Sequence, residues 1–467
     1  MTELADKTAR ELARGYRKNA FSPVEVMQAV LARCEERKEL NAFVTLVPEM
    51  ALAGAKAAEA LQGAGGELPP LHGLPYSVKD LTLTKGVRTT MGSLTMADNV
   101  PDQDAVAVAR AKAGGAILIG KTATPEFGHK IHTTTLLSGR TLNPHSPDVT
   151  PGGSSGGAAV AVATGQGPIA LGTDGGGSVR IPSACCGTVG LKPTLGTVPN
   201  LQAADLFSSN VHVAPMARDV GDTRLLFDAI RGFDRRDPYG QAIAPVSRQV
   251  QTLKGLRVAW LPQAGNPVDR EIAAITAAAI GSIEAEGAIV EEVYLDLAAL
   301  EPHFMVVLET LLAGRVGGML EANRDRIDPT LLVHVENGMK HGALALAAAG
   351  AARTRAFAAV QEMLGRFDII ASPTLSAPPL PHDQDPHGSV PINGVPSGRV
   401  RAVWYPYTVA TNLTGHPSIS IPCGWDSHNL PVGFHMTAAW YQEDLLLDCA
   451  ALAEALFGFN LAAHRAM

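Results

Sequence analysis

The hydrophobic and polar positions along the chain alternate between two periods, which predicts strands separated by helices. Short apolar runs of strand length lie at 75–78, 116–119, 169–172, 258–261, 369–371 and 418–421. Alanine-rich segments of helical length lie between them. Strands that alternate with helices indicate an α/β fold. We therefore expect a mixed, mostly parallel central sheet covered by helices on both faces.

The first seventy residues are predicted to be helical. Ser22, Pro23 and Glu25 have the residue types that helices favour at the N-cap, the first helical position and the third. Apolar residues then recur near the helical period between residues 24 and 31. The segment 50–61 predicts another helix, and the Gly-Pro cluster at 63–70 predicts a loop into the core.

We expect one domain over residues 1–467. Within it, 1–70 would form an N-terminal helical segment, 71–220 the catalytic core, and 302–352 a variable helical lid or pocket wall. The proline- and glycine-rich segment 376–398 is typical of a long surface loop.

Composition narrows the function. The chain is 46% hydrophobic with a net charge of −7, so a large core is available and nucleic-acid binding has no support. The five cysteines show no CxxC spacing, which argues against a disulfide framework or a zinc site. We expect Cys185 and Cys186 to be small core residues.

The N-terminus is charged throughout, which argues against a secretory signal, and no apolar run reaches the length of a membrane span. These features predict a cytoplasmic protein with no membrane partner.

Glycine-rich segments around serine mark the candidate chemistry. Two such sites are Gly152–Gly157 and Gly175–Ser178, and an isolated lysine, Lys79, ends an apolar run upstream. Glycine lets a backbone expose a hydroxyl and direct N–H groups at a developing oxyanion. Serine with a lysine base is a known variant of the serine nucleophile arrangement. The pattern favours a serine hydrolase.

These motifs identify a family resemblance. The serine-glycine segment runs without a gap from Gly152 to about Pro193, and the lysine motif is GLPYSVKD at 73–80. Further matches are GKTATPEF at 120–127, APMAR at 214–218 and LPVGFHM at 430–436. The chain resembles the amidase signature family over nearly its whole length.

The resemblance implies a catalytic set. Ser178 would be the nucleophile, Ser154 the bridging serine after a cis peptide at Gly153, and Lys79 the base. The oxyanion donors would be the backbone N–H groups of Gly175, Gly176, Gly177 and Ser178. Ser155 would add a hydrogen bond, and Asp174 would pair with Arg180 to hold the loop.

The implied reaction is hydrolysis of the C–N bond of a small amide or anilide through an acyl-enzyme, with esters and carbamates also within reach. No cofactor or metal is expected, and the chain would act as a monomer or homodimer. One alternative is an amidotransferase subunit of a tRNA-dependent complex. The other is a non-catalytic scaffold, which the complete triad disfavours.

Other motif matches are weaker. Gly115–Thr122 fits a P-loop string, but its apolar centre indicates a strand. Gly152–Gly156 fits the nucleophile elbow, which would need a histidine such as His416 or His435. The group at 382–387 is more typical of a solvated turn than of a metal site.

Departures from the family pattern affect the pocket more than the triad. Val211 replaces an expected acidic residue, Ala214 replaces a glycine, and His435 replaces a common glutamine. The segment Thr437–Trp440 stands where relatives usually have a glycine-rich continuation. We expect the pocket to be lined by apolar and aromatic residues, with these candidates: Tyr76, Met91, Phe127, Leu206 and Phe207.

Overall fold

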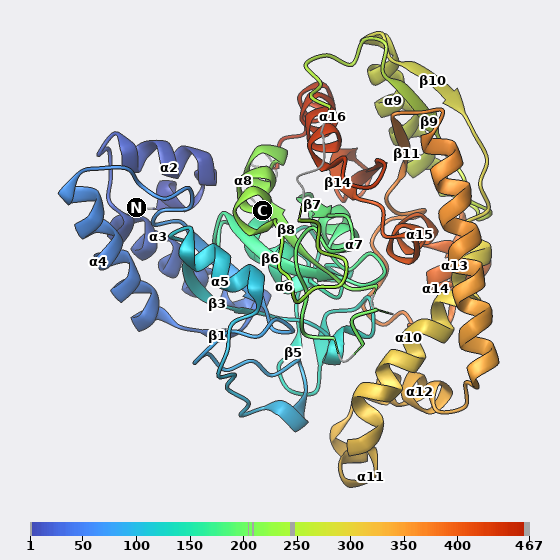
Figure 1. Cartoon of the computed structure of the whole chain (residues 1–467), viewed down its shortest axis with the longest axis horizontal. Coiled ribbons are helices and arrows are strands. Elements are labelled where there is room, and N and C mark those ends of the chain that lie inside the picture. Colours follow the sequence, from blue (N-terminus) through green and yellow to red (C-terminus); the bar gives the residue numbers. More distant parts are fainter. Residues whose placement is uncertain (1, 204, 208–209, 243–247, 462–467) are drawn as a thin grey trace.

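The computed structural model describes residues 2–203, 205–207, 210–242 and 248–461. Within them, a central 11-stranded sheet runs through the molecule (Figure 1). Its strands, in spatial order, are β1 Phe43–Leu46, β3 Ile117–Thr122, β2 Pro75–Lys79, β6 Ile169–Asp174, β8 His212–Ala217, β7 Val189–Lys192, β14 Ser418–Trp425, β15 Pro431–Thr437, β11 Ile369–Pro373, β9 Arg257–Trp260 and β10 Ile289–Glu292.

The sheet is mixed, as predicted. Parallel pairing holds within two groups of strands, β3–β2–β6 near one end and β11–β9–β10 at the other. Antiparallel pairs connect β6 through β8, β7, β14 and β15 to β11, and β1 is antiparallel to β3. The glycine-rich segment after β6 thus leaves the sheet at the inner edge of the first parallel group.

Helices cover both faces of the sheet, which confirms the predicted α/β class. One face packs against α2 Ala9–Arg17, α3 Pro23–Glu36, α4 Pro48–Ala64, α5 Val106–Ala113, α8 Val220–Ile230, α9 Arg270–Ala285 and α16 Glu443–Phe457, with the short α1 Thr2–Ala5 against α3. The other face packs against α6 Gly156–Ala163, α7 Arg180–Cys186, α13 Ala343–Leu364 and α15 Pro406–Thr414.

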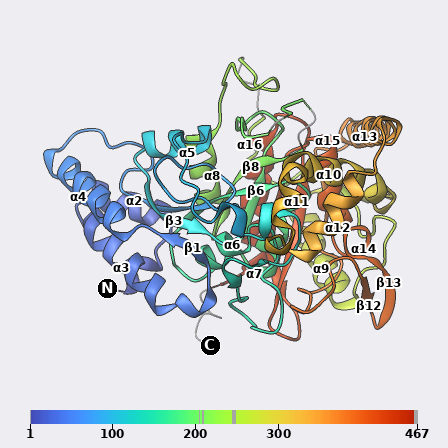
Figure 2. The ribbon, with the colours of Figure 1, turned by 90° about the horizontal axis from the view of Figure 1, so that it is seen from below.

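A helical group stands at the end of the molecule away from the N-terminal helices (Figures 1 and 2). It contains α10 Glu301–Val316, α11 Leu320–Asn323, α12 Pro329–Gly338 and α14 Val400–Val403. Leu312, Val316, Leu331 and Val335 of this group form an apolar cluster with Met91 and Phe127. The segment 302–352 is therefore helical, as predicted, and closes over loops that follow β2 and β3.

Local signals at the N-terminus are confirmed. Ser22 caps α3 through its hydroxyl, which accepts from the Glu25 N–H at 3.2 Å, and the Glu25 carboxylate accepts from the Ser22 N–H at 2.7 Å. Pro23 occupies the first turn. Each of the apolar runs that predicted strands lies in or beside a strand of the sheet.

The segment 376–398 differs from the prediction of a long surface loop. Its first residues, 376–380, are mostly buried, and its end forms part of a hairpin of β12 Ser389–Ile392 and β13 Val395–Arg399. A tight turn at Asn393-Gly394, with positive φ at both residues, makes this pairing local. Another small pairing joins β4 Thr134–Thr135 to β5 Gly139–Arg140.

Two helical segments, Ala298–Arg326 and Ala343–Leu364, are long and apolar enough to cross a membrane by length and composition. The prediction that no apolar run reaches that length missed these two helices, because both also contain polar and charged residues. Such helices are weak evidence for a membrane span, and the first of them forms one wall of the cavity described next.

Candidate active site

Lys79 is the last residue of β2 and is fully buried. Its Nζ lies 2.8 Å from the Ser154 Oγ and 3.2 Å from the carbonyl oxygen of Thr173. Burial lowers the pKa of the amine well below its ordinary value, and the nearby Asp174 acts in the opposite direction. A lysine in this environment is neutral more readily than a surface lysine, which suits it to accept a proton.

The serine pair before α6 has the geometry that the resemblance implied. The Gly153–Ser154 peptide is cis, and Ser154 is buried next to the Lys79 amine. The Ser155 hydroxyl donates to the Thr173 carbonyl at 3.2 Å, and the Ser155 N–H donates to the Ser178 carbonyl at 3.0 Å. Ser155 therefore connects the start of α6 to β6 and to the loop after it.

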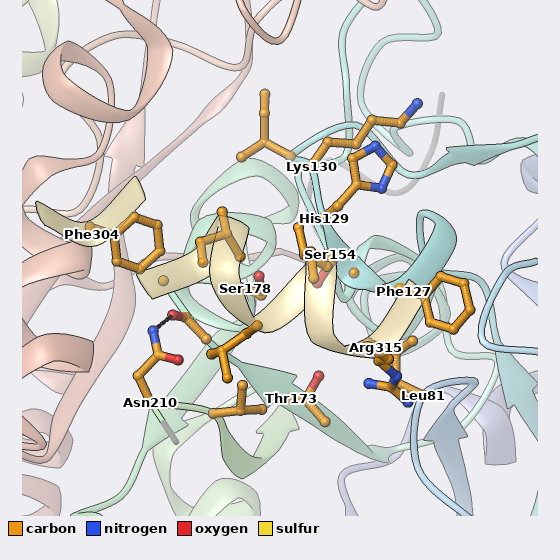
Figure 3. Close-up of a pocket in the computed structure, with 18 of the residues that line it drawn as sticks. Leu81, Phe127, His129, Lys130, Ser154, Thr173, Ser178, Asn210, Phe304 and Arg315 are labelled. Atoms are coloured by element: carbon orange, nitrogen blue, oxygen red, sulfur yellow. Dashed lines mark hydrogen bonds between the residues drawn. The ribbon is translucent and has the colours of Figure 1, made fainter. Parts of the chain in front are cut away.

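Ser178 lies in the glycine loop between β6 and α7 and is partly accessible. Ser178 and Ser154 line the same cavity, and both are labelled in Figure 3. Among the described residues, Ser154 has a hydrogen bond to Lys79, whereas the Ser178 hydroxyl has none. The structure thus brings the three predicted side chains to one site, with the Lys79–Ser154 half already bonded.

Asp174 and Arg180 form a fully buried ion pair at the two ends of the loop, as predicted. Arg180 Nε donates to Asp174 Oδ2 at 3.0 Å, and Nη2 donates to Oδ1 at 2.9 Å. Burial alone would raise the pKa of the Asp174 carboxyl, but the charge and hydrogen bonds of Arg180 hold it far below its ordinary value. Asp174 therefore stays ionised inside the protein.

The Asp174 carboxylate also holds the loop by accepting hydrogen bonds from backbone N–H groups of the loop. It accepts from the Gly177 N–H at 2.7 Å and from the Val179 N–H at 3.1 Å. Gly177 has φ +125°, and a Cβ there would lie 2.8 Å from Ile181 Cδ1, so only glycine fits without strain. The Gly177 N–H is consequently occupied, while Gly175, Gly176 and Ser178 line the cavity.

Residues distant in sequence support the pair from α15 and from the strands β14 and β15. The Arg180 guanidinium also donates to Ser418 Oγ at 3.0 Å, lies 3.2 Å from His435 Nε2, and donates to the Thr408 carbonyl at 3.0 Å. Burial and the charge of Arg180 lower the pKa of His435, which is neutral and can accept this bond. Sequence reasoning missed Thr408 and Ser418, because no local pattern marks them.

The cavity above the serines has a volume of about 160 Å³. Apolar side chains form most of its walls, and Figure 3 shows Phe304 and Phe127 on opposite sides of the view. Its lining residues are Leu81, Phe127, Gly128, His129, Lys130, Ile131, Ser154, Thr173, Gly175, Gly176, Ser178, Ile181, Asn200, Gln202, Ala203, Asn210, Val211, Phe304, Leu308, Leu311, Leu312, Arg315, Arg401 and Tyr405. Helix α10 thus supplies one wall.

Of the pocket candidates, Phe127 lines this cavity and the others do not. Tyr76 lies three positions before Lys79 in β2, so its side chain points to the opposite face of the sheet, where it packs into the core. Met91 lies behind the wall in the cluster with α10 and α12, and Leu206 borders a separate hollow. Phe207 is 72% exposed. The paths of the loops, which composition does not encode, decide the positions of Met91, Leu206 and Phe207.

The structure also shows where the weaker motif matches and the departures from the family pattern lie. Residues 117–122 of the P-loop match form β3, as its apolar centre indicated. Neither His416 nor His435, the histidines considered for a nucleophile elbow, lines the cavity. His129 does line it, but its ring nitrogens lie 2.7 Å from the Glu126 carbonyl oxygen and 2.7 Å from the Thr330 Oγ1. Val211 lines the cavity and Ala214 is buried in β8.

Two further sequence hypotheses concern cysteines and metals. Cys185 and Cys186 are buried core residues of α7, as predicted. Within the described residues, no group of three or more His, Cys, Asp or Glu side chains is arranged to hold a metal ion.

Comparison with known proteins agrees with the motifs. The Amidase family model matches residues 25–447. An acylamidase of Rhodococcus erythropolis is 34% identical over 463 residues, which cover 96% of this chain and 95% of that protein. One component of the glutamyl-tRNA(Gln) amidotransferase of Methylococcus capsulatus is 36% identical, with 95% and 96% coverage. A solved bacterial aryl acylamidase has a TM-score of 0.90 at 27% identity, covering 98% of this chain and 97% of that one. This chain belongs to the amidase signature family and is an amidase, a hydrolase of carbon–nitrogen bonds.

Proposed function

We propose that the chain hydrolyses small amides or anilides through an acyl-enzyme, with Ser178 as nucleophile, Ser154 as bridge and Lys79 as base. The observation that carries the proposal is the 2.8 Å contact between the Lys79 Nζ and the Ser154 Oγ, beneath a cavity that Ser178 also lines. A buried lysine bonded to a serine, beside a second serine open to a cavity, is the arrangement that activates a hydroxyl.

The proton would travel along this set. Ser178 Oγ bonds to the carbonyl carbon and passes its proton to Ser154, while Ser154 passes its own proton to the neutral Lys79 amine. The protonated lysine then returns a proton through Ser154 to the leaving nitrogen, and the C–N bond breaks. Water repeats the sequence on the acyl ester and releases the acid.

The loop N–H groups would hold the oxyanion. Gly175, Gly176 and Ser178 line the cavity, and their N–H groups are the donors of this proposal. The sequence-based set also included Gly177, but its N–H donates to Asp174 at 2.7 Å, so we withdraw it. Loss of one oxyanion donor costs about 2.7–4 kcal/mol in an acyl-transfer enzyme.

The cavity favours an apolar or aromatic substrate. Phe127, Phe304 and the leucines of α10 form its walls, and two relatives are named as acylamidases, one of them an aryl acylamidase. Esters and carbamates present the same carbonyl to the same nucleophile, so we include them. We propose that the chain works alone or as a homodimer, without a cofactor.

A second candidate is a subunit of a tRNA-dependent amidotransferase, favoured by relatives such as the one 36% identical. If such a subunit took its nitrogen from the side-chain amide of a free amino acid, the α-ammonium group of that amino acid would need an acidic partner. None of the described residues that line the cavity is Asp or Glu. This lining favours a hydrolase of simple amides.

A fluorophosphonate label tests the proposed roles. We expect an adduct on Ser178, mapped by mass spectrometry, and loss of both labelling and acetanilide turnover in Ser178→Ala. Lys79→Met should slow turnover by a factor of about 10² to 10⁴, the usual contribution of a general base. The matched control is Ser183→Ala on α7, a buried serine that does not line the cavity and should label normally.

The alternative outcomes separate the candidates. An adduct on Ser154 or Ser155 instead would refute the assignment of the nucleophile. Glutamine hydrolysis that appears only with partner subunits, with no turnover of anilides by the chain alone, would favour the amidotransferase.

A further inference from the structure

The charges on the cavity wall all have one sign. Its charged lining residues are Lys130, Arg315 and Arg401, and no Asp or Glu is among the described residues that line it. His129 adds no charge near neutral pH, because burial lowers its pKa. The cavity is therefore apolar with a net positive lining.

Two of these cations already have partners in the protein. The Lys130 Nζ lies 2.5 Å from Asp328 Oδ2, and both side chains are nearly buried. Arg401 is buried and donates from Nη2 to the His129 carbonyl at 2.8 Å. These contacts hold the loop 129–130 against α12 and α14, so both residues have a structural use.

Arg315 on α10 is different. Its guanidinium lies over the Phe127 ring, 5.2 Å from the centroid, and Nη2 lies 3.5 Å from the Met91 sulfur, a weak acceptor. Within the described part of the chain, no carboxylate pairs with it. A guanidinium has five N–H donors in a planar fork, and most of these have no strong acceptor from the protein.

We infer that Arg315 binds an anionic group of the substrate, so that the preferred amides combine an apolar body with a carboxylate. The inference rests on the proposed function and names its substrate class. Arg315 and Ser178 line one cavity of about 160 Å³, so a single small molecule can reach both. Figure 3 shows the guanidinium beside Phe127 and Leu81, with the serines between it and Phe304.

The physical reason is complementarity. A carboxylate can accept two parallel N–H bonds from the arginine fork, which gives both energy and orientation. The apolar walls would receive the rest of the molecule and lower the local dielectric constant around the ion pair. An ammonium group would find no carboxylate among the described lining residues, so amides with a free amine should be poor substrates.

The experiment compares pairs of anilides in which a carboxylate replaces an isopropyl group of similar shape. On the acyl side, the monoanilide of glutaric acid is compared with 5-methylhexananilide. On the amine side, 4-acetamidobenzoate is compared with 4-isopropylacetanilide. The measured quantity is the ratio of kcat/KM within each pair, for the wild type, Arg315→Met, Arg315→Lys and the control Arg355→Met. Arg355 is an exposed arginine of α13 that does not line the cavity.

We expect the wild type to favour the carboxylate by about tenfold or more in one pair, equivalent to about 1.4 kcal/mol. Arg315→Met should abolish that ratio, Arg315→Lys should keep part of it, and Arg355→Met should keep all of it. The pair that shows the preference identifies whether the acyl or the amine portion faces Arg315. A ratio near one in both pairs, or a ratio that survives Arg315→Met, would overturn the inference.

Binding to Ser178→Ala separates this inference from the proposed function. Calorimetry with the same pairs reports affinity whether or not the chain turns them over. Carboxylate-selective binding that requires Arg315, without turnover by the wild type, would support the inference and contradict the proposed function. Turnover of both anilides of a pair, without selectivity for the carboxylate, would support the proposed function and overturn the inference. If neither of the two carboxylates binds, the inference is also overturned.

Discussion

Removal of Arg180 should cost more stability than any surface change in this protein. Its side chain is fully buried and makes two bonds to Asp174, at 3.0 and 2.9 Å. Substitution by methionine keeps much of the volume but leaves the Asp174 carboxylate buried without its counter-charge. The variants to compare are Arg180→Met, Asp174→Asn and the double mutant.

The magnitude follows from what is left unpaired. Breaking a buried ion pair from one side costs about 3–5 kcal/mol, because the remaining charge has no compensation. The donors at Gly177 and Val179 still bond to Asp174, so we expect the lower half of this range for the pair itself. The further acceptors of Arg180, among them Ser418 and the Thr408 carbonyl, also lose their donor and bring the total back toward about 5 kcal/mol.

The assay is urea unfolding followed by tryptophan fluorescence. Urea is preferred to guanidinium because it does not screen the ion pair. The double mutant removes both charges, so it should be at least about 1 kcal/mol more stable than Arg180→Met despite carrying an additional substitution.

The pH dependence has a definite sign. In the wild type, the pKa of Asp174 is depressed, so its contribution to stability is present above the unfolded value of about 3.9 and lost as the pH falls below it. In Arg180→Met, burial without the guanidinium should raise that pKa, and protonation then relieves the buried charge. The stability gap between wild type and variant should shrink as the pH is lowered from 7.

Two results would refute this reasoning. A cost below about 1 kcal/mol for Arg180→Met would mean that the pair contributes no net stability. A double mutant as unstable as the sum of the single mutants would mean that the two charges do not compensate each other.

Three further predictions concern Lys79, Gly177 and Asp328. The kcat/KM of the wild type should fall as the pH is lowered through the depressed pKa of Lys79, because the protonated amine cannot accept a proton. A pH profile of kcat/KM with a neutral anilide measures this, and a profile that stays flat at low pH would contradict it. Gly177→Ala should cost about 1–3 kcal/mol of stability and most of the activity, because the φ of Gly177 is +125° and the added Cβ would clash with Ile181. Gly281→Ala, at an open position inside α9, should be neutral or stabilising. Thermal unfolding compares the two variants. Asp328→Asn should loosen the contact between Lys130 and α12 and lower the melting temperature, with charge-conserving Asp328→Glu less affected.

Much of the fold was predictable because its signals are local. The capping box at Ser22 and the apolar runs of the sheet depend on residues within a few positions of each other, and each gave the expected element. The alternation of β2 could also have excluded Tyr76 from the pocket, since a side chain three positions from Lys79 points to the opposite face of a strand. The hairpin at the end of 376–398 was missed because proline and glycine also occur in ordinary loops.

The sequence by itself determined which residues we expected at the site: two serines framed by glycine, a lysine at a strand end, and the Asp174–Arg180 pair around the loop. These residues lie in continuous motifs, so their spacing can be recognised in the sequence without a structure. The sequence led us to expect a lid or pocket wall within 302–352, but only the tertiary structure decided that α10 lies beside the serines and that Arg315 lies on this wall, with no carboxylate partner among the described residues. The physical reason is that packing between segments more than a hundred residues apart depends on how the whole sheet is covered, and no local period encodes it.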